Sequence, residues 1–229
     1  MIQIKTLMAS VALALAVAVS GCSDDNGTTA SPVATGEVRV AHLSPDAPNV
    51  DVAVDGAVVL SNVPYEAVSD YLDVPSGPHT VTVTPAGATS PVVINAQINV
   101  VAHAAATVAA TGLLGEGDLQ PLPLADDRMT TGQAKVRFVH TAPDAPPVDI
   151  AVPGGQVVPG FRNIAFRESS NYVGLDAGTY DLDVRVSGTR TVALTLEDAS
   201  LAPGTNYSIF AIGLLADGSL EALIAVDSQ

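Results

Sequence analysis

The residues of this sequence whose types and spacing could do chemistry are a histidine and two aspartates that occur together twice. The first set is His42, Asp46 and Asp51, and the second is His140, Asp144 and Asp149. Imidazole nitrogens and carboxylate oxygens are ligands that zinc, or a hard ion such as calcium, accepts in proteins. One hypothesis is therefore a metal site in each copy.

The turn-forming residues around Asp46 favour a structural interpretation of the same segment. Pro45 and Pro48 flank Asp46, and an Asp in such a turn can accept hydrogen bonds from backbone N–H groups. The Val/Asp alternation that follows places Asp51 on the solvent face of a strand. The sequence contains no Asp-x-Asp-x-Asp-Gly calcium loop. We therefore favour the structural role and keep metal binding as the alternative.

The same segment could serve a hydrolase only with Ser44 as nucleophile, His42 as base and Asp46 as the residue that orients the base. Ala142 stands in the place of Ser44 in the second copy, and the sequence has no Gly-x-Ser-x-Gly elbow. We predict no catalytic residues, no cofactor and no enzymatic activity.

These residues belong to a long internal repeat, which is the strongest signal in the chain. The segment Val38–Val54 returns as Val136–Val152 with His, Pro, Asp, Ala, Pro, Val and Asp in the same order. Further on, Gly112-Leu113-Leu114 returns as Gly213-Leu214-Leu215. The two copies together predict two domains of the same fold.

Each copy consists of short apolar or alternating runs separated by Pro and Gly, and helical periodicity is nowhere sustained. In the first copy the expected strands span 37–43, 50–54, 71–74, 79–84, 92–100 and 105–113. Turn-forming residues at 115–118 and 216–219 predict a hairpin in each copy. Many short strands separated by turns are typical of a sandwich. We predict an all-β protein with two tandem antiparallel β-sandwich domains, immunoglobulin-like or transthyretin-like.

The repeat also predicts the domain boundaries. Residues 37–127 form the first β-sandwich, residues 128–133 a linker, and residues 134–229 the second β-sandwich. Residues 22–36, rich in Asp, Thr, Ser and Gly, are expected to form a flexible tether. Residues 1–21 are expected to form a signal peptide that the mature protein lacks.

The N-terminal residues have the layout of a bacterial lipoprotein signal. Lys5 precedes an apolar run, Leu7 to Val19, that is shorter than the roughly 20 residues a transmembrane helix needs. Val19-Ser20-Gly21-Cys22 matches the lipobox, in which a peptidase cuts before a lipid-modified cysteine. We predict a protein anchored to the cell envelope by lipidation of Cys22. Because Ser23 rather than Asp follows, the outer membrane is favoured if the host is diderm.

Charge and cysteine content exclude two classes of function. The formal net charge is −15, so nucleic acid phosphates are repelled and no nucleic acid partner is expected. Cys22 is the only cysteine, so once it is lipidated the protein has no disulfide and no cysteine metal site. The expected partners are the membrane, through the lipid, and envelope or extracellular proteins.

Two pairs of residues outside the motif receive structural interpretations. Tyr71 and Tyr172 recur shortly before a Gly turn and are expected to be buried, with hydroxyls that tie down a loop; a ligand platform is the alternative. Asp126 and Asp127, at the end of the first domain, are interpreted as solvated, with a weak calcium contact at the interdomain joint as the alternative.

The paired motif resembles the bacterial domain of unknown function 4397 family. The matching residues of the first copy are Arg39, His42, Pro45, Asp46, Ala47, Pro48, Val50 and Asp51, and those of the second are Arg137, His140, Pro143, Asp144, Ala145, Pro146, Val148 and Asp149. The resemblance implies exported or lipid-anchored tandem β-sandwiches and implies no catalytic residues. We expect a non-catalytic envelope lipoprotein that binds or scaffolds an unknown ligand, with metal binding by the repeated His/Asp segments as the alternative.

Overall fold

The computed structural model describes residues 33–228, so the predicted signal peptide and the lipidation site at Cys22 lie outside the described residues. The described residues form strands, turns and loops, which confirms the all-β prediction. This part of the chain holds no helix that could cross a membrane.

The strands fall into two sets, one in each repeat. The first set is β1 (Thr35–His42), β2 (Val50–Val54), β3 (Ala57–Val63), β4 (Leu72–Pro75), β5 (Gly77–Pro85), β6 (Ile94–Val100), β7 (Ala105–Thr111) and β8 (Gln120–Asp126). The second set is β9 (Ala134–His140), β10 (Val148–Ala151), β11 (Val173–Leu175), β12 (Gly178–Val186), β13 (Val192–Leu201), β14 (Asn206–Ile212) and β15 (Glu221–Val226).

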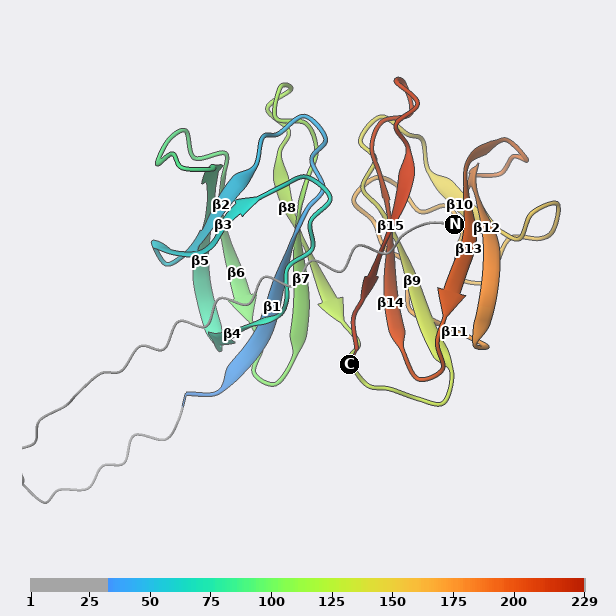
Figure 1. Cartoon of the computed structure of the whole chain (residues 1–229), viewed down its shortest axis with the longest axis horizontal. Coiled ribbons are helices and arrows are strands. Elements are labelled where there is room, and N and C mark those ends of the chain that lie inside the picture. Colours follow the sequence, from blue (N-terminus) through green and yellow to red (C-terminus); the bar gives the residue numbers. More distant parts are fainter. Residues whose placement is uncertain (1–32, 229) are drawn as a thin grey trace, which may run out of the picture. The chain divides into compact units, whose positions relative to one another are not determined.

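Each set forms a sandwich of two sheets (Figure 1), which confirms the predicted fold class. The sheets have the strand orders β4-β1-β7-β8 and β3-β2-β5-β6 in the first repeat, and β11-β9-β14-β15 and β10-β12-β13 in the second. Most neighbours are antiparallel, but β1 with β7 and β9 with β14 are parallel pairs. Strand β1 starts within the predicted tether, because Thr35 and Gly36 pair with β4.

The repeats differ in the segment after the motif. In the first repeat, β3 pairs with β2 along a ladder that contains register shifts. In the second repeat, the corresponding segment makes only isolated bridges, Val148 with Ile164 and Ala151 with Val157. The second copy is the longer one here, since Val54 and Ser69 correspond to Val152 and Ser170. The additional residues of the second copy therefore lie in a segment that forms no equivalent of β3.

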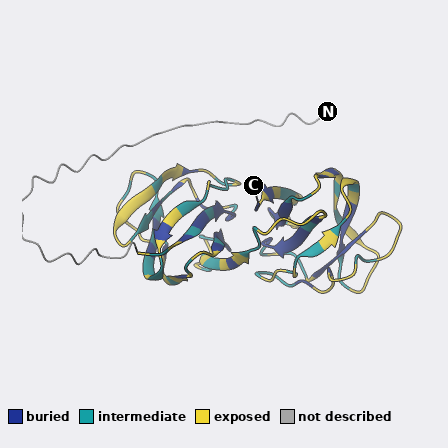
Figure 2. Cartoon of the chain, turned by 90° about the horizontal axis from the view of Figure 1, so that it is seen from below, coloured by how far each residue is buried: buried dark blue, intermediate teal, exposed yellow. Residues whose placement is uncertain are grey.

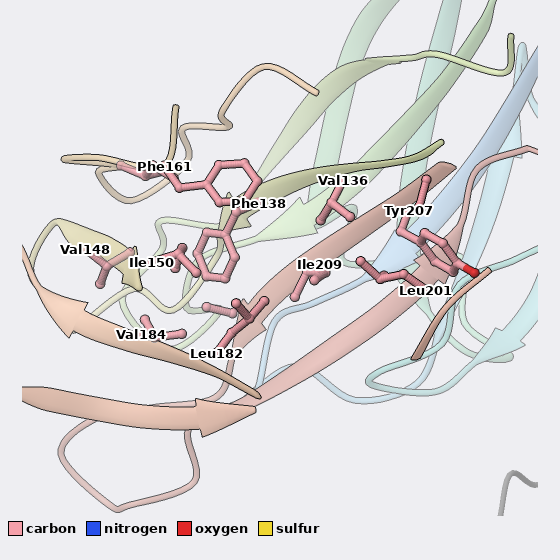
Figure 3. Packing of buried hydrophobic residues seen from close by; sticks show 13 residues of the cluster. Val136, Phe138, Val148, Ile150, Phe161, Leu182, Val184, Leu201, Tyr207 and Ile209 are labelled. Carbon is pink, nitrogen blue, oxygen red and sulfur yellow. The ribbon is translucent and has the colours of Figure 1, made fainter. Parts of the chain in front are cut away.

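The two sandwiches also differ in what fills their cores. The core of the second contains three aromatic side chains, Phe138, Phe161 and Tyr207, which pack on aliphatic residues (Figure 3). The core clusters of the first sandwich contain only aliphatic residues, and most of these are valines. Aromatic side chains bury far more area than valine does. The second core is therefore filled by larger groups than the first.

A further apolar cluster joins the repeats, and we call it the shared cluster. Its buried members are Ala41, Leu43, Ala109, Leu124, Val139, Phe210, Ile212 and Ala225. Because successive residues of a strand point to opposite faces, the central strands use one face for their own sandwich and the other for the shared cluster. Figure 2 shows that the buried residues lie mainly on strands, whereas the loops are mostly exposed or intermediate. Every residue of β14 is buried as a result.

Candidate functional site

The motif histidines end strands β1 and β9 and are buried, His42 at 1% and His140 at 0% exposure. The Nε2 atom of His42 lies 3.0 Å from the carbonyl oxygen of Pro48, and that of His140 lies 3.1 Å from the carbonyl oxygen of Pro146. A carbonyl only accepts hydrogen bonds, so we assign the proton to Nε2 in both rings. Burial lowers the pKa of both imidazoles below 6.5, and the backbone contacts only partly oppose this.

The burial of these histidines predicts a loss of stability in mild acid. Because the pKa of each is lower in the folded state, the stabilisation is complete above about pH 6.5 and is lost as pH falls below it. We expect each histidine to contribute a slope of up to about 1.4 kcal/mol per pH unit in that window. Urea unfolding of wild type and of a His42→Asn/His140→Asn variant between pH 5 and 8 measures it.

His79 provides a control, because its pKa is shifted in the opposite direction from those of His42 and His140. Its hydrogen bond to Asp55 and its contact with the Pro75 carbonyl raise its pKa, so its contribution is present below about pH 6.5 and is lost as pH rises through the higher folded-state value. A His79→Asn variant should keep the loss of stability in mild acid. An acid slope that persists in the His42→Asn/His140→Asn variant would show that the buried imidazoles are not its source.

The motif aspartates Asp46 and Asp144 hold the hairpin that ends each repeat. The carboxylate of Asp46 accepts the backbone N–H groups of Leu114 and Gly115, at 2.7 and 2.8 Å. Asp144 accepts those of Leu215 and Ala216, both at 2.8 Å. Burial would raise the pKa of Asp46, but these amides outweigh it and the pKa is lowered. The carboxylate thus fastens the motif turn to a distant turn.

Removing this carboxylate should loosen the turn between β7 and β8. We expect Asp46→Ala to lower the free energy of unfolding by about 1 kcal/mol, a moderate loss because the site is solvent-exposed. Because the pKa of Asp46 is lowered in the folded state, the effect should be complete above about pH 3.8 and should shrink as pH falls through the lower folded-state value. Glu116→Ala, an exposed change in the same turn, is the control. Equal unfolding midpoints for the two variants would contradict the role of Asp46.

The remaining motif aspartates bind loops of the sheets β3-β2-β5-β6 and β10-β12-β13, which we call the outer sheets. Asp51 lies between buried Val50 and Val52, as the alternation predicted, and its carboxylate accepts the N–H groups of Asn62 and Gly87 at 2.7 and 2.9 Å. In the second repeat, Asp149 accepts from the N–H groups of Asn163 and Gly188 and from the Ser187 hydroxyl. Unlike Asp51, Asp149 is buried.

The structure does not bring each set of motif residues together as a ligand set. Among residues 33–228 there is no group of three or more His, Cys, Asp and Glu side chains placed to hold a metal ion. The carboxylates of Asp46 and Asp51 each bind backbone amides of different loops. Metal binding stays a prediction, and elemental analysis of protein dialysed against calcium and zinc tests it.

Arg39 and Arg137 lie at the centre of a buried polar cluster, and the sequence interpretation gave neither a role. The Arg39 guanidinium donates to the Asp227 carboxylate, to the Val226 carbonyl at 2.8 Å and to the Thr107 hydroxyl at 2.8 Å. Each arginine reaches into the opposite repeat. This reciprocal arrangement, which we call the arginine exchange, lies beside the shared cluster.

The second half of the arginine exchange repeats the first with corresponding residues. Arg137 donates to the Asp126 carboxylate, to the Ala125 carbonyl at 2.8 Å and to the Ser208 hydroxyl at 2.7 Å. The side chains of both arginines are 3% exposed, and those of both aspartates are 0% exposed. The interpretation of Asp126 as a solvated residue is therefore wrong, because the second repeat covers it.

Tyr71 and Tyr172, which recur in the two copies, complete the arginine exchange. The hydroxyl of Tyr71 donates to Asp126, and that of Tyr172 donates to Asp227, both at 2.7 Å. The guanidinium of Arg39 lies 4.8 Å from the Tyr71 ring centroid, within the range of a cation–π contact. Burial raises the pKa of both tyrosines. Both tyrosines are half-buried, and each hydroxyl binds a carboxylate of the arginine exchange rather than the backbone of a loop.

Donors surround the Asp227 carboxylate on all sides. Burial raises its pKa, whereas the Tyr172 hydroxyl, the Arg39 guanidinium and the Ser208 hydroxyl act against that rise. The Arg39 guanidinium can only donate and carries a positive charge, so its contact favours the carboxylate form of Asp227. The charge is thus paired and hydrogen-bonded inside the protein, which is the condition for a tolerable buried ion pair.

Outside the arginine exchange, the repeats contact each other through residues that break the internal symmetry. Arg167 donates to the Thr111 carbonyl and the Asp118 carboxylate of the first repeat, both at 3.1 Å. The corresponding residue of the first repeat is Glu66, whose pKa is raised by burial and by neighbouring Glu221. The sequence alone gives no signal for these two pairings.

Comparisons with known proteins give a family. No curated protein matches the chain. A solved structure, the Bacillus anthracis TIE protein, aligns with 11% identity and a TM-score of 0.26 over 79% of this chain and 34% of its own. This chain thus spans about a third of the length of the TIE protein, and we draw no structural inference from so low a TM-score. The model of the Domain of unknown function (DUF4397) matches residues 36–151 and 143–229. The chain therefore belongs to the DUF4397 family, in tandem copies.

Proposed function

We propose that this protein is a non-catalytic envelope lipoprotein whose two sandwiches act as one rigid module for binding or scaffolding. The observation that carries the proposal is the arginine exchange, in which Arg39 binds Asp227 and Arg137 binds Asp126. Flexibly linked domains move independently unless their interface is large and apolar. Here the shared cluster supplies apolar contact and the arginine exchange fixes its geometry.

The motif chemistry supports a structural use of its polar residues. The imidazoles of His42 and His140 are buried beneath their own turns, and Asp46 and Asp144 bind the backbone of the terminal hairpins. A general base must reach a substrate proton within hydrogen-bond distance. The Nε2 atom of each imidazole and both oxygens of each carboxylate contact the backbone of the protein itself, and such side chains are suited to building a stable surface. We propose that the ligand binds to the outside of the module.

Anchoring at the envelope is part of the proposal and has its own test. The lipobox Val19-Ser20-Gly21-Cys22 supports it. Cells fed a labelled fatty acid should label the wild-type chain and not a Cys22→Ala variant, and the variant should leave the membrane fraction. Equal labelling of both chains would show that Cys22 is not the acylated residue.

The rigid module is tested by measuring the distance between the repeats. Spin labels at exposed positions, Asn95→Cys and Glu197→Cys, should give one narrow distance distribution in the wild-type background. The same labels in an Arg39→Met/Arg137→Met background should give a broad distribution. A broad distribution in the wild-type background would contradict the rigid module.

Binding is tested by site-specific cross-linking in intact cells. A photoreactive residue on the outer sheets should yield a defined adduct with an envelope protein, and the Arg39→Met/Arg137→Met background should weaken that adduct. Turnover of ester, peptide or glycosidic substrates that falls on changing His42 and His140 to Ala would overturn the non-catalytic assignment.

A further inference from the structure

The first sandwich contains an open apolar cavity of about 360 Å³ between its two sheets. Its lining includes Val38, Ile98, Val100, Val101, Ala106 and Val108, contributed by β1, β6, β7 and the loop after β6. Val101 is 59% exposed, so the cavity can be reached from solvent. Ligand pockets in proteins have volumes of about 300 to 1,000 Å³ and mostly apolar walls.

The second repeat shows what fills this space in its own sandwich. Ala106 pairs with Val38 in the parallel ladder of the first repeat, and Tyr207 pairs with Val136 in that of the second. Tyr207 is therefore the structural counterpart of Ala106. Figure 3 shows the Tyr207 ring lying inside the second sandwich beside Leu201. Leu201 corresponds in turn to the smaller Val100. The cavity is the space that an aromatic ring and a larger aliphatic group occupy in the other repeat.

The hydroxyl of Tyr207 shows which polar group suits this space. It accepts a hydrogen bond from the backbone N–H of Ala202 at 3.0 Å. The counterpart of Ala202 is Val101, whose side chain lines the cavity. Within residues 33–228 the backbone N–H of Val101 has no hydrogen-bond partner. The first repeat thus presents the amide donor without the phenolic oxygen that accepts from it.

We propose that this cavity binds a small hydroxyaromatic molecule, with its ring beside Ala106 and its hydroxyl accepting from the Val101 N–H. A cavity of about 150 Å³ lined by aliphatic and aromatic residues can bind benzene, so the larger cavity here holds a phenol ring with space for substituents. The internal repeat supplies the size, the apolar walls and the polar partner of this ligand. The site goes beyond the proposed binding of a protein partner and does not depend on it.

Calorimetric titration of the full-length protein with phenol tests the site. We expect saturable binding of one phenol per chain, and weaker binding of benzene, which cannot accept the hydrogen bond from Val101. Ala106→Tyr places in the first repeat the residue that the second has, and it should abolish phenol binding. Binding of benzene as tight as that of phenol would overturn the hydroxyaromatic assignment.

Two further variants keep the test independent of one substitution. Val100→Leu is a smaller change that narrows the cavity and should weaken phenol binding while the fold persists. Tyr207→Ala opens the matching space in the second repeat and should raise the stoichiometry to two. No saturable phenol binding by wild type, or binding unaffected by both Ala106→Tyr and Val100→Leu, would overturn the proposal.

Discussion

Arg39→Met is expected to lower the free energy of unfolding by about 3–5 kcal/mol, because it leaves a buried carboxylate without its cation. The carboxylate is that of Asp227, whose side chain is 0% exposed. The same change removes the donor to the Val226 carbonyl. Met retains most of the aliphatic volume of the side chain, so the loss reports on the charge and its hydrogen bonds. Urea unfolding at neutral pH measures it.

A double-mutant cycle separates the pair from its surroundings. Asp227→Asn removes the unpaired charge, so the Arg39→Met/Asp227→Asn protein should lose less stability than the sum of the single changes. Arg190→Met, at an exposed position, is the control and should change stability by less than about 0.5 kcal/mol. Arg137→Met should resemble Arg39→Met because the contacts are reciprocal. Arg39→Met behaving like Arg190→Met would refute the importance of the buried pair.

The sequence predicted the sandwich because the repeat and the alternation of valines are local signals. It did not include β3 and β8 among the expected strands. Pro121 and Pro123 argue against a central strand, since proline cannot donate to a ladder. Strand β8 tolerates them because it lies at the edge of its sheet and pairs only with β7. The hairpin turn before it was the better guide to this strand.

The role of Asp46 was predictable in kind but not in its partners. The expected contact was a local turn, whereas the donors are Leu114 and Gly115 in the β7–β8 hairpin. A turn that is closed by a residue far away in the sequence leaves no local signal beyond the turn-forming residues themselves. Pattern analysis therefore identified the hydrogen-bonding group and could not identify what it fastens.

The joining of the repeats was the largest feature that the sequence analysis missed. Arg39 alternates with Val38 and Val40 in β1, a pattern that normally places a charge in solvent. The informative signal lies in the second half of β14, where Ile209–Ile212 is an unbroken apolar run. Such a run is typical of a strand buried on both faces. This run predicts a second buried face for the sheet that contains β9 and β14, and hence a partner surface for it.

Phe210→Ala is expected to cost about 3–5 kcal/mol, the range for removing a fully buried aromatic side chain. Phe210 is 0% exposed and belongs to the shared cluster rather than to the core of its own sandwich. The resulting cavity lies where the repeats meet, so the domains should lose cooperativity as well as stability. Scanning calorimetry should show one transition for wild type and two for the variant.

The control for Phe210→Ala is an aromatic residue of the same repeat that packs in the core of its own sandwich rather than in the shared cluster. Phe161 is 1% exposed and belongs to the core of the second sandwich, so Phe161→Ala should destabilise that sandwich by a similar amount. Its spin-label distance between repeats should stay narrow at temperatures where the protein is folded, whereas that of Phe210→Ala should broaden. If the two variants gave the same distance distributions, the shared cluster would not be what holds the repeats in register. A difference between them would assign the rigidity of the module to side chains on the outward faces of β1, β9 and β14, where the motif arginines also lie.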